Sequence, residues 1–274
     1  MNKFLKEFLW SHDVFRYEDI LEAIPYYRDK KGELNIALAY HVRQGTLISI
    51  KRYVYAVVPR GCSVEDAPYA VDPFLLASQL ASDAVISYHS ALAFYGYLHS
   101  LRFEFIYSTG QVKNYTTLNF GNNIYKSTQF PRRLREKKKE LIGVKKELRG
   151  GQELKITSPE RTFVDILDRP KILGYDWEEI ARSLDKTYMG NPGLLVDYLA
   201  LLGSRLTASR VGYFLERRKD ELRLGEEVLD EIQDLSSNSL VHLDPNHKKG
   251  NVLSKRWNLL VPENLFYSKW EEIF

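Results

Sequence analysis

The sequence predicts an α+β protein built from three consecutive parts, and three observations support this fold class. Apolar residues recur with helical spacing toward both ends of the chain, whereas the segments between residues 103 and 156 are rich in β-branched and aromatic residues bounded by Gly and Asn. The length of 274 residues suits about two or three domains, each able to bury its own core. A composition of 44% hydrophobic and 27% charged residues is that of a globular chain.

The first sixty residues have the pattern of three helices followed by a hairpin. Helical spacing and helix-ending residues predict helices at 2–10, 17–23 and 33–44, the last stopped by Gly45. Two strands are expected at 47–50 and 54–58. A helix that enters the major groove beside a two-stranded wing is the arrangement of a winged helix-turn-helix, which the sequence therefore predicts for residues 1–60.

The rest of the chain divides into a mixed part and a helical part. Residues 61–157 predict helices at 72–81 and 87–95, followed by a small antiparallel sheet with strands at 103–107, 116–120, 125–129, 141–147 and 153–156. Residues 158–274 predict a mainly helical part, which begins at the N-cap Ser158 and continues at 160–167, 176–184, 193–202, 207–219 and 226–235. Residues 240–274 are expected to be irregular.

Charge and cysteine content limit the classes of partner. The net charge of +3 is too small to indicate a polyanionic partner, but residues 1–60 hold ten Lys or Arg against seven Asp or Glu, and residues 128–155 hold ten against four. The lone Cys62 excludes an internal disulfide and a cysteine zinc cluster. With no apolar run long enough for a signal peptide or a membrane span, we expect a cytoplasmic protein without a membrane partner.

The third predicted helix has an apolar side and an outward side. Leu34, Leu38 and Val42 share one narrow arc and are expected in the core, with His41 partly buried beside them. The outward side chains of this helix suit contacts with bases. The cations before the helix and at the hairpin tip suit contacts with phosphates. The candidate DNA-binding residues are Arg28, Lys30, Lys31, Asn35, Ile36, Tyr40, Arg43, Lys51, Arg52 and Tyr53.

A second basic patch follows the predicted strand at 125–129. It is the densest positive stretch of the chain and contains Arg132, Arg133, Arg135, Lys137, Lys138 and Lys139. Two interpretations stay open: the patch contacts phosphate, or it is a solvated hairpin or loop, as blocks of like charge more often are.

The sequence contains no recognisable catalytic constellation. Gly150 and Gly151 are not followed by the Lys-Ser/Thr of a phosphate-binding loop, and no Gly-Ser pair precedes spaced aspartates as in nucleotidyltransferases. Arg161 and Asp165, four residues apart on a predicted helix, have the spacing of a structural ion pair. We therefore expect neither an enzyme nor a cofactor.

One loop has the spacing of a metal site. His242, Asp244 and His247 lie close together in the sequence, and Pro245 and Asn246 favour a turn there. Because loop histidines are more often solvated than metal-bound, we expect no metal, and a metal-dependent nuclease that uses this loop is kept as the less favoured alternative.

Five motifs, in order and with their spacing, resemble the AbiEi family of antitoxins from the type IV toxin–antitoxin systems of bacterial abortive infection. The matching stretches are VRQGTL at 42–47, DPFLLA at 72–77, SYHSAL at 87–92 followed by Gly96, SPERTFVD at 158–165 and SRVGYFLE at 209–216. The wing of that family usually carries a glycine before the tyrosine of its second strand. Here Tyr53 and Val54 precede Tyr55, which predicts a differently shaped wing tip.

The resemblance implies a DNA-binding antitoxin that represses its own operon through the N-terminal domain and counteracts a nucleotidyltransferase-like toxin. The expected partners are double-stranded operator DNA, as an inverted repeat bound by a dimer or two copies, and the toxin, with direct contact left open. The alternative from another class is an antitoxin that acts only through protein contacts, with a vestigial winged helix.

Overall fold

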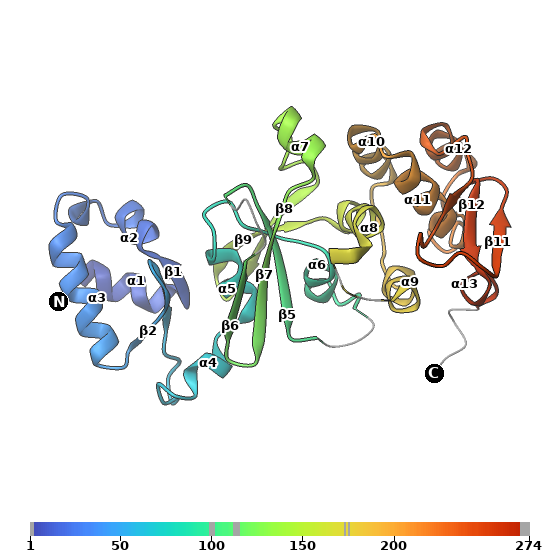
Figure 1. The fold of residues 1–274 in the computed structure, drawn as a ribbon. Coiled ribbons are helices and arrows are strands. Elements are labelled where there is room, and N and C mark those ends of the chain that lie inside the picture. Colours follow the sequence, from blue (N-terminus) through green and yellow to red (C-terminus); the bar gives the residue numbers. More distant parts are fainter. Residues whose placement is uncertain (1–2, 99–101, 112–115, 173, 175, 269–274) are drawn as a thin grey trace. The chain divides into compact units, whose positions relative to one another are not determined.

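The computed structural model describes residues 3–98, 102–111, 116–172, 174 and 176–268, and the chain forms an α+β fold with two compact units (Figure 1). Unit 1 contains residues 1–86, 103–129 and 145–156, and unit 2 contains residues 87–102, 130–144 and 157–274. These units cut across the three consecutive segments expected from the sequence, because residues 61–86 belong to the same unit as residues 1–60, whereas residues 87–102 and 130–144 belong with the C-terminal residues. Within the described residues, no helix is long and apolar enough to cross a membrane.

The N-terminal part of unit 1 combines three helices with a small sheet. Its elements are α1 (Lys3–Ser11), β1 (Val14–Arg16), α2 (Tyr17–Ala23), the 3₁₀ turn η1 (Pro25–Tyr27), α3 (Lys31–Arg43), β2 (Leu47–Lys51) and β3 (Val54–Val57). The strands lie in the order β1-β3-β2, and both pairings are antiparallel. The core packs α1, α2 and α3 around Leu5, Ile20, Leu34 and Leu38. Phe4 of α1 is exposed.

The remainder of unit 1 is a six-stranded sheet with helical cover. Its elements are α4 (Ala67–Ala70), α5 (Pro73–Gln79), β4 (Val85–Ile86), β5 (Glu104–Thr109), β6 (Thr117–Phe120), β7 (Asn123–Gln129), β8 (Val144–Arg149) and β9 (Gln152–Thr157), with strand order β6-β7-β5-β4-β9-β8. The expectation of an antiparallel sheet is wrong, because β5 pairs with β7 in parallel and β4 pairs with β9 in parallel. After β5 the chain builds β6 at the sheet edge, so β7 returns between them in the direction of β5.

Helix α5 is fixed by a cap that also reaches the sheet. The Asp72 carboxylate accepts hydrogen bonds from the backbone N–H groups of Phe74 and Leu75, at 2.9 and 3.1 Å. Its other oxygen accepts a hydrogen bond of 2.6 Å from Nε of Arg149, at the end of β8. The residues that begin α5 therefore also hold it against a distant strand.

Gln152 joins the N-terminal elements of unit 1 to the six-stranded sheet. Its Oε1 accepts hydrogen bonds from the backbone N–H groups of Asp13 and Val14, at 2.7 and 3.3 Å, and its Nε2 donates to the carbonyl of Val14 at 2.8 Å. The buried amide thus pairs with β1 as a neighbouring backbone would. A hydrogen bond of 3.2 Å from Nε of Arg16 to Oε1 of Gln79 adds a second contact.

We expect Gln152→Ala to lower the free energy of unfolding by about 2 kcal/mol, since it leaves backbone groups of β1 without partners. Urea unfolding measures the loss, and hydrogen exchange should speed up at residues 13–16. The control is Glu153→Ala, which removes only an exposed ion pair with Lys146 on the same hairpin. Equal stability of the two variants would contradict the role assigned to Gln152.

Unit 2 is built mainly from helices, with a small sheet near its C-terminal end. Its elements are α6 (His89–Phe94), α7 (Arg132–Lys137), α8 (Pro159–Asp168), the 3₁₀ turn η2 (Pro170–Ile172), α9 (Trp177–Asp185), α10 (Pro192–Leu202), α11 (Arg205–Arg217), α12 (Glu226–Leu235), β10 (Val241–His242), β11 (Asn251–Ser254), β12 (Leu259–Pro262) and α13 (Glu263–Tyr267). Side-chain N-caps start four of the helices, namely Ser158, Asp176, Asn191 and Ser204.

The expected ion pair of α8 lies in the interior of unit 2. Nε of the fully buried Arg161 lies 3.3 Å from Oδ2 of Asp165, whose other oxygen accepts a hydrogen bond of 2.5 Å from the hydroxyl of Tyr198. Nη1 of Arg161 donates to the carbonyls of Glu140 and Ile142, at 2.6 and 2.7 Å. The side chain therefore ties the loop after the basic helix α7 to α8.

The expectation that residues 240–274 are irregular is wrong for much of the segment. Strands β10, β12 and β11 form a sheet in that order, and α13 follows. These strands are only two to four residues long, too short for a period of two to stand out in the sequence. Residues 269–274, with Trp270, lie outside the described residues.

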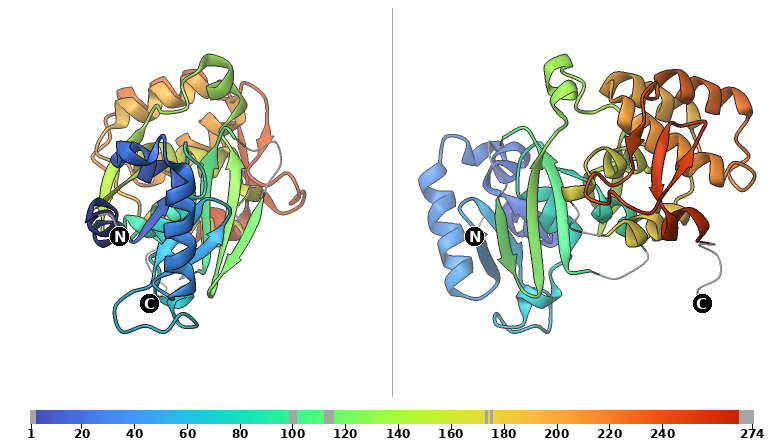
Figure 2. Two further views of the ribbon diagram at one scale, coloured as in Figure 1. Left: turned by 90° about the vertical axis from the view of Figure 1, so that its left-hand side faces the viewer. Right: turned by 45° about the vertical axis from the view of Figure 1, so that its right-hand side comes forward.

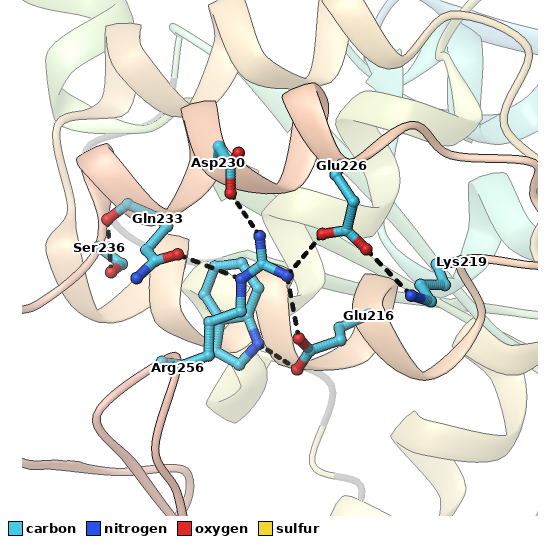
Figure 3. Close-up of polar contacts among 8 residues, drawn as sticks. Glu216, Lys219, Glu226, Asp230, Gln233, Ser236 and Arg256 are labelled. Atoms are coloured by element: carbon cyan, nitrogen blue, oxygen red, sulfur yellow. Dashed lines mark hydrogen bonds and ion pairs between the residues drawn. The ribbon is translucent and has the colours of Figure 1, made fainter.

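The turn between β11 and β12 is bound to α11 and α12 through Arg256. Its guanidinium donates to Asp230, Glu226, Gln233 and Glu216, at 2.6, 2.9, 3.1 and 3.2 Å (Figure 3). Such a network of charge-assisted hydrogen bonds orients the turn. The neighbouring Trp257 is fully buried and donates from Nε1 to Glu216 at 2.7 Å.

Gly212 of α11 makes room for this indole ring. A Cβ atom added at Gly212 would lie 2.1 to 2.4 Å from ring carbons of Trp257. We expect Gly212→Ala to destabilise the protein by about 2 kcal/mol or more, although alanine normally favours a helix by about 1 kcal/mol. Thermal or urea unfolding measures the change.

Gly193 of α10 provides the matched control for this substitution. Its added Cβ would meet only the Asn191 side chain, at an ordinary contact distance of 3.5 Å. Gly193→Ala should therefore leave stability unchanged or raise it. The steric account would fail if Gly212→Ala were as stable as Gly193→Ala.

Candidate nucleic-acid interface

The outward face of α3 is the candidate surface for nucleic acid. Leu34, Leu38 and His41 are buried, whereas Ile36 is 70% exposed and Tyr40 is 51% exposed. In the left view of Figure 2, α3 lies toward the viewer, in front of the rest of the N-terminal elements of unit 1. The expected division of this helix into an inward and an outward side is therefore observed.

Six exposed residues of α3 share one side of the helix, as their spacing at 100° per residue requires, and the exposed Lys31 and Glu33 lie at its two borders. This set, called here the outward face, consists of Gly32, Asn35, Ile36, Ala39, Tyr40 and Arg43. Gly32 and Ala39 were not among the sequence candidates, although the same helical spacing places them there. An added Cβ at Gly32 would meet no atom within 4 Å. The helix surface at Gly32 is therefore free of neighbouring protein atoms and carries no side chain.

The electrostatics of the outward face suit an anionic partner. Glu33 is the single acidic residue of α3, and its carboxylate is paired with Nζ of Lys30 at 3.1 Å and with the hydroxyl of Tyr26 at 2.8 Å. These hydrogen bonds hold the pKa of Glu33 below its ordinary value. The side chains of Asn35 and Arg43 make no hydrogen bond or ion pair with another described residue. They remain available to a ligand.

The cations before α3 differ in their availability. Arg28 donates from Nε to the carbonyl of Leu21 at 2.9 Å and from Nη2 to that of Glu22 at 3.3 Å, and so caps the end of α2. Lys30 is engaged with Glu33, whereas the exposed Lys31 side chain has no partner among the described residues. Of these three cations, only Lys31 has a side chain without a hydrogen bond or ion pair to a described residue.

The three candidate residues at the tip of the β2–β3 hairpin differ in their contacts. Nζ of Lys51 donates to the carbonyl of Leu80 at the end of α5, at 2.5 Å, and burial lowers its pKa. The exposed Arg52 lies over the ring of Tyr53, 4.8 Å from its centroid. Lys51 thus joins the hairpin to α5, while Arg52 and Tyr53 stay at the surface.

Tyr53 adopts the backbone conformation that a glycine would favour. Its φ is +66°, in the left-handed region, and its carbonyl accepts a hydrogen bond of 2.9 Å from the N–H of Tyr17. The two tyrosine rings lie 5.5 Å apart. At this position Tyr53 thus takes the left-handed conformation without a glycine, and its ring packs on Tyr17.

His41 supports α3 from its inner side, as expected for a partly buried histidine. Its Nδ1 lies 2.8 Å from Oγ1 of Thr46, and burial lowers its pKa. The N–H of Thr46 donates to the carbonyl of His41 at 3.0 Å. These contacts fix the path of the chain from α3 into β2. His41 therefore has a structural role and does not itself face a ligand.

The second basic patch occupies α7 and the residues after it, in unit 2. Leu134 is buried and anchors the helix, while all six cations of the patch are exposed. Arg132 pairs with Glu136 at 2.6 Å, and Lys138 ends the helix with a φ of +52°. The patch is thus a short helix rather than a hairpin or loop, held by Leu134 and by the Arg161 contacts to its following loop.

The loop with His242, Asp244 and His247 does not assemble a metal site. Asp244 Oδ1 accepts a hydrogen bond of 2.9 Å from the N–H of Asn246, which turns the loop. Within the described ranges, no three His, Cys, Asp or Glu side chains are grouped so that they could hold a metal ion. The nuclease alternative therefore has no metal centre in this part of the chain.

Comparison with known proteins extends only to the fold. No protein-family model and no curated protein sequence matches the chain. Among solved structures, the crystal structure of the RV2827C protein from Mycobacterium tuberculosis is similar, with a TM-score of 0.51 and 16% sequence identity over 90% of this chain and 86% of that chain. At this identity the similarity concerns the α+β fold and carries no statement about activity.

Proposed function

We propose that the N-terminal elements form a winged helix-turn-helix that binds duplex DNA through α3 and the β2–β3 hairpin. The observation that carries the proposal is the outward face of α3, which offers Asn35 and Arg43 without intramolecular partners and has no unpaired carboxylate. A helix of this kind fits the major groove, and a neighbouring hairpin reaches the DNA backbone. Lys31 at the start of α3 and Arg52 at the hairpin tip suit phosphate contacts.

We further propose that the chain is an antitoxin that represses its own toxin–antitoxin operon in the cytoplasm and acts by binding rather than by catalysis. The five sequence motifs that resemble those of the AbiEi antitoxins support this role. The proposed partners are an inverted-repeat operator and a nucleotidyltransferase-like toxin. The basic patch on α7 is proposed as an additional phosphate contact, since its cations face solvent.

A gel-shift titration tests the proposal. The full chain is mixed with a duplex from upstream of its own gene and, separately, with an unrelated duplex of equal length. We expect preferential retardation of the upstream duplex. Its affinity should fall as salt rises: log Kd should increase by about 0.9 per tenfold rise in salt concentration for each phosphate contact.

The same titration distinguishes the alternative of an antitoxin that acts only through protein contacts. Absence of retardation for both duplexes would contradict the DNA-binding proposal, and equal retardation would contradict preference for the operator. Co-purification with the product of an adjacent toxin gene, in the absence of any retardation, would favour the protein-contact alternative.

A further inference from the structure

We infer that α3 reads A·T base pairs, with Asn35 hydrogen-bonded to adenine and Ile36 packed on the methyl group of thymine. The inference rests on the proposed function and names the DNA sequence class that the outward face recognises. Asparagine can donate to N7 and accept from N6 of adenine in the major groove, and apolar side chains contact the thymine methyl group.

Ile36 is the residue that makes the A·T assignment specific. It stands in the middle of the outward face and is 70% exposed, beside the exposed Tyr40 one turn further along. Leaving a large aliphatic side chain in water forgoes the free energy of its burial. In the major groove, the thymine methyl group is the apolar feature that such a side chain can cover.

The small residues of the outward face allow the close approach that this contact needs. Gly32 and Ala39 lie on either side of Asn35 and Ile36 along the helix, and the space around Gly32 is open. Neither holds the helix away from the floor of the groove. Between these two positions, Asn35 and Ile36 are the residues of the outward face that carry larger side chains.

The distribution of cations argues against guanine at the centre of the site. Arginine and lysine are the usual readers of guanine, through O6 and N7. In α3 the cations stand only at the ends, Lys31 at the start and Arg43 at the finish, with twelve residue steps between them. At a rise of about 1.5 Å per residue, Arg43 lies about 10 Å beyond Ile36, over different base pairs or a phosphate.

Selection from a random duplex pool tests the inference with the full chain. We expect the retained sequences to share at least two adjacent A·T pairs in each half-site. The best duplex is then made again with uracil in place of each selected thymine, which removes only the methyl group. Wild-type affinity should fall about fourfold per contacted methyl group, as the burial of one such group predicts.

Two substitutions connect the effect to the residues. Ile36→Ala should bind the thymine and uracil duplexes equally, and Asn35→Ala should lose at least about fivefold of the preference for adenine. Both side chains are exposed, so the variants keep the fold, which circular dichroism checks.

The outcomes separate the inference from the function on which it rests. The inference would be overturned, while DNA binding stands, by a selected sequence without A·T pairs. It would also be overturned if wild-type affinity did not fall with uracil, or if Ile36→Ala lost as much affinity with uracil as the wild type. Recovery of no duplex from the pool would overturn the proposed function itself.

Discussion

Replacing Arg161 by alanine should lower the free energy of unfolding by about 3 to 5 kcal/mol. The substitution leaves the Asp165 carboxylate buried without its cation and deprives the carbonyls of Glu140 and Ile142 of their donor. Because these carbonyls belong to the loop after α7, hydrogen exchange should also accelerate across residues 132–143. Urea unfolding combined with hydrogen exchange measures both effects.

Two further variants show whether the effect comes from buried contacts. Arg161→Lys keeps the charge but not the planar fork of donors, so it should recover only part of the lost stability. Arg205→Ala removes an exposed arginine from α11 in the same unit and should change stability by less than about 0.5 kcal/mol. The account of Arg161 would be wrong if its alanine variant resembled that of Arg205.

Reversing the charge at Arg43 and Arg52 together should weaken binding of the upstream duplex by at least about 100-fold. One cation lies on the outward face of α3 and the other at the hairpin tip, so the double variant replaces attraction to phosphate with repulsion at both elements. The effect should shrink at high salt, where these charges are screened. Fluorescence anisotropy at several salt concentrations measures it.

The control for this variant is the pair Lys3→Glu and Lys6→Glu on α1. It makes the same change in net charge on exposed residues of the same unit. We expect a loss of less than about fivefold from the altered overall field alone. Similar losses for the two double variants would show that binding depends on net charge and not on α3.

The longer helices could be predicted from the sequence because their signals are local. The caps Asp72 and Ser158 start helices where expected, and α6 lies within the helix expected at 87–95. The alternation of buried and exposed residues in α3 likewise follows from spacing alone. The whole outward face therefore follows from spacing, although Gly32 and Ala39 were not among the candidates.

The sheets could not be predicted in the same way, because strand pairing depends on distant residues. Strand β1 has three residues and exists through its pairing with β3, in which Val14 lies opposite Ala56. The parallel pairing of β5 with β7 depends on where β6 is placed. No local pattern in the sequence contains that information.

The cations of the candidate site show the same limit. Residue type and exposure made Arg28 and Lys51 candidates for phosphate contact, but their donors go to carbonyls at the ends of α2 and α5. These partners come from elements whose positions the sequence does not reveal. Lys31, Asn35 and Arg43, whose partners are absent among the described residues, are the candidates that retain their full capacity for DNA.

Photo-crosslinking from α3 tests the central claim most directly. A benzophenone side chain is placed at Tyr40 on the outward face or, as the control, at the exposed Trp10 on α1, and each protein is irradiated with the upstream duplex. We predict a covalent protein–DNA product from position 40 that unlabelled upstream duplex competes away, and little product from position 10. Equal products from both positions, or none from position 40 under conditions where the duplex is bound, would contradict the claim that α3 enters the DNA.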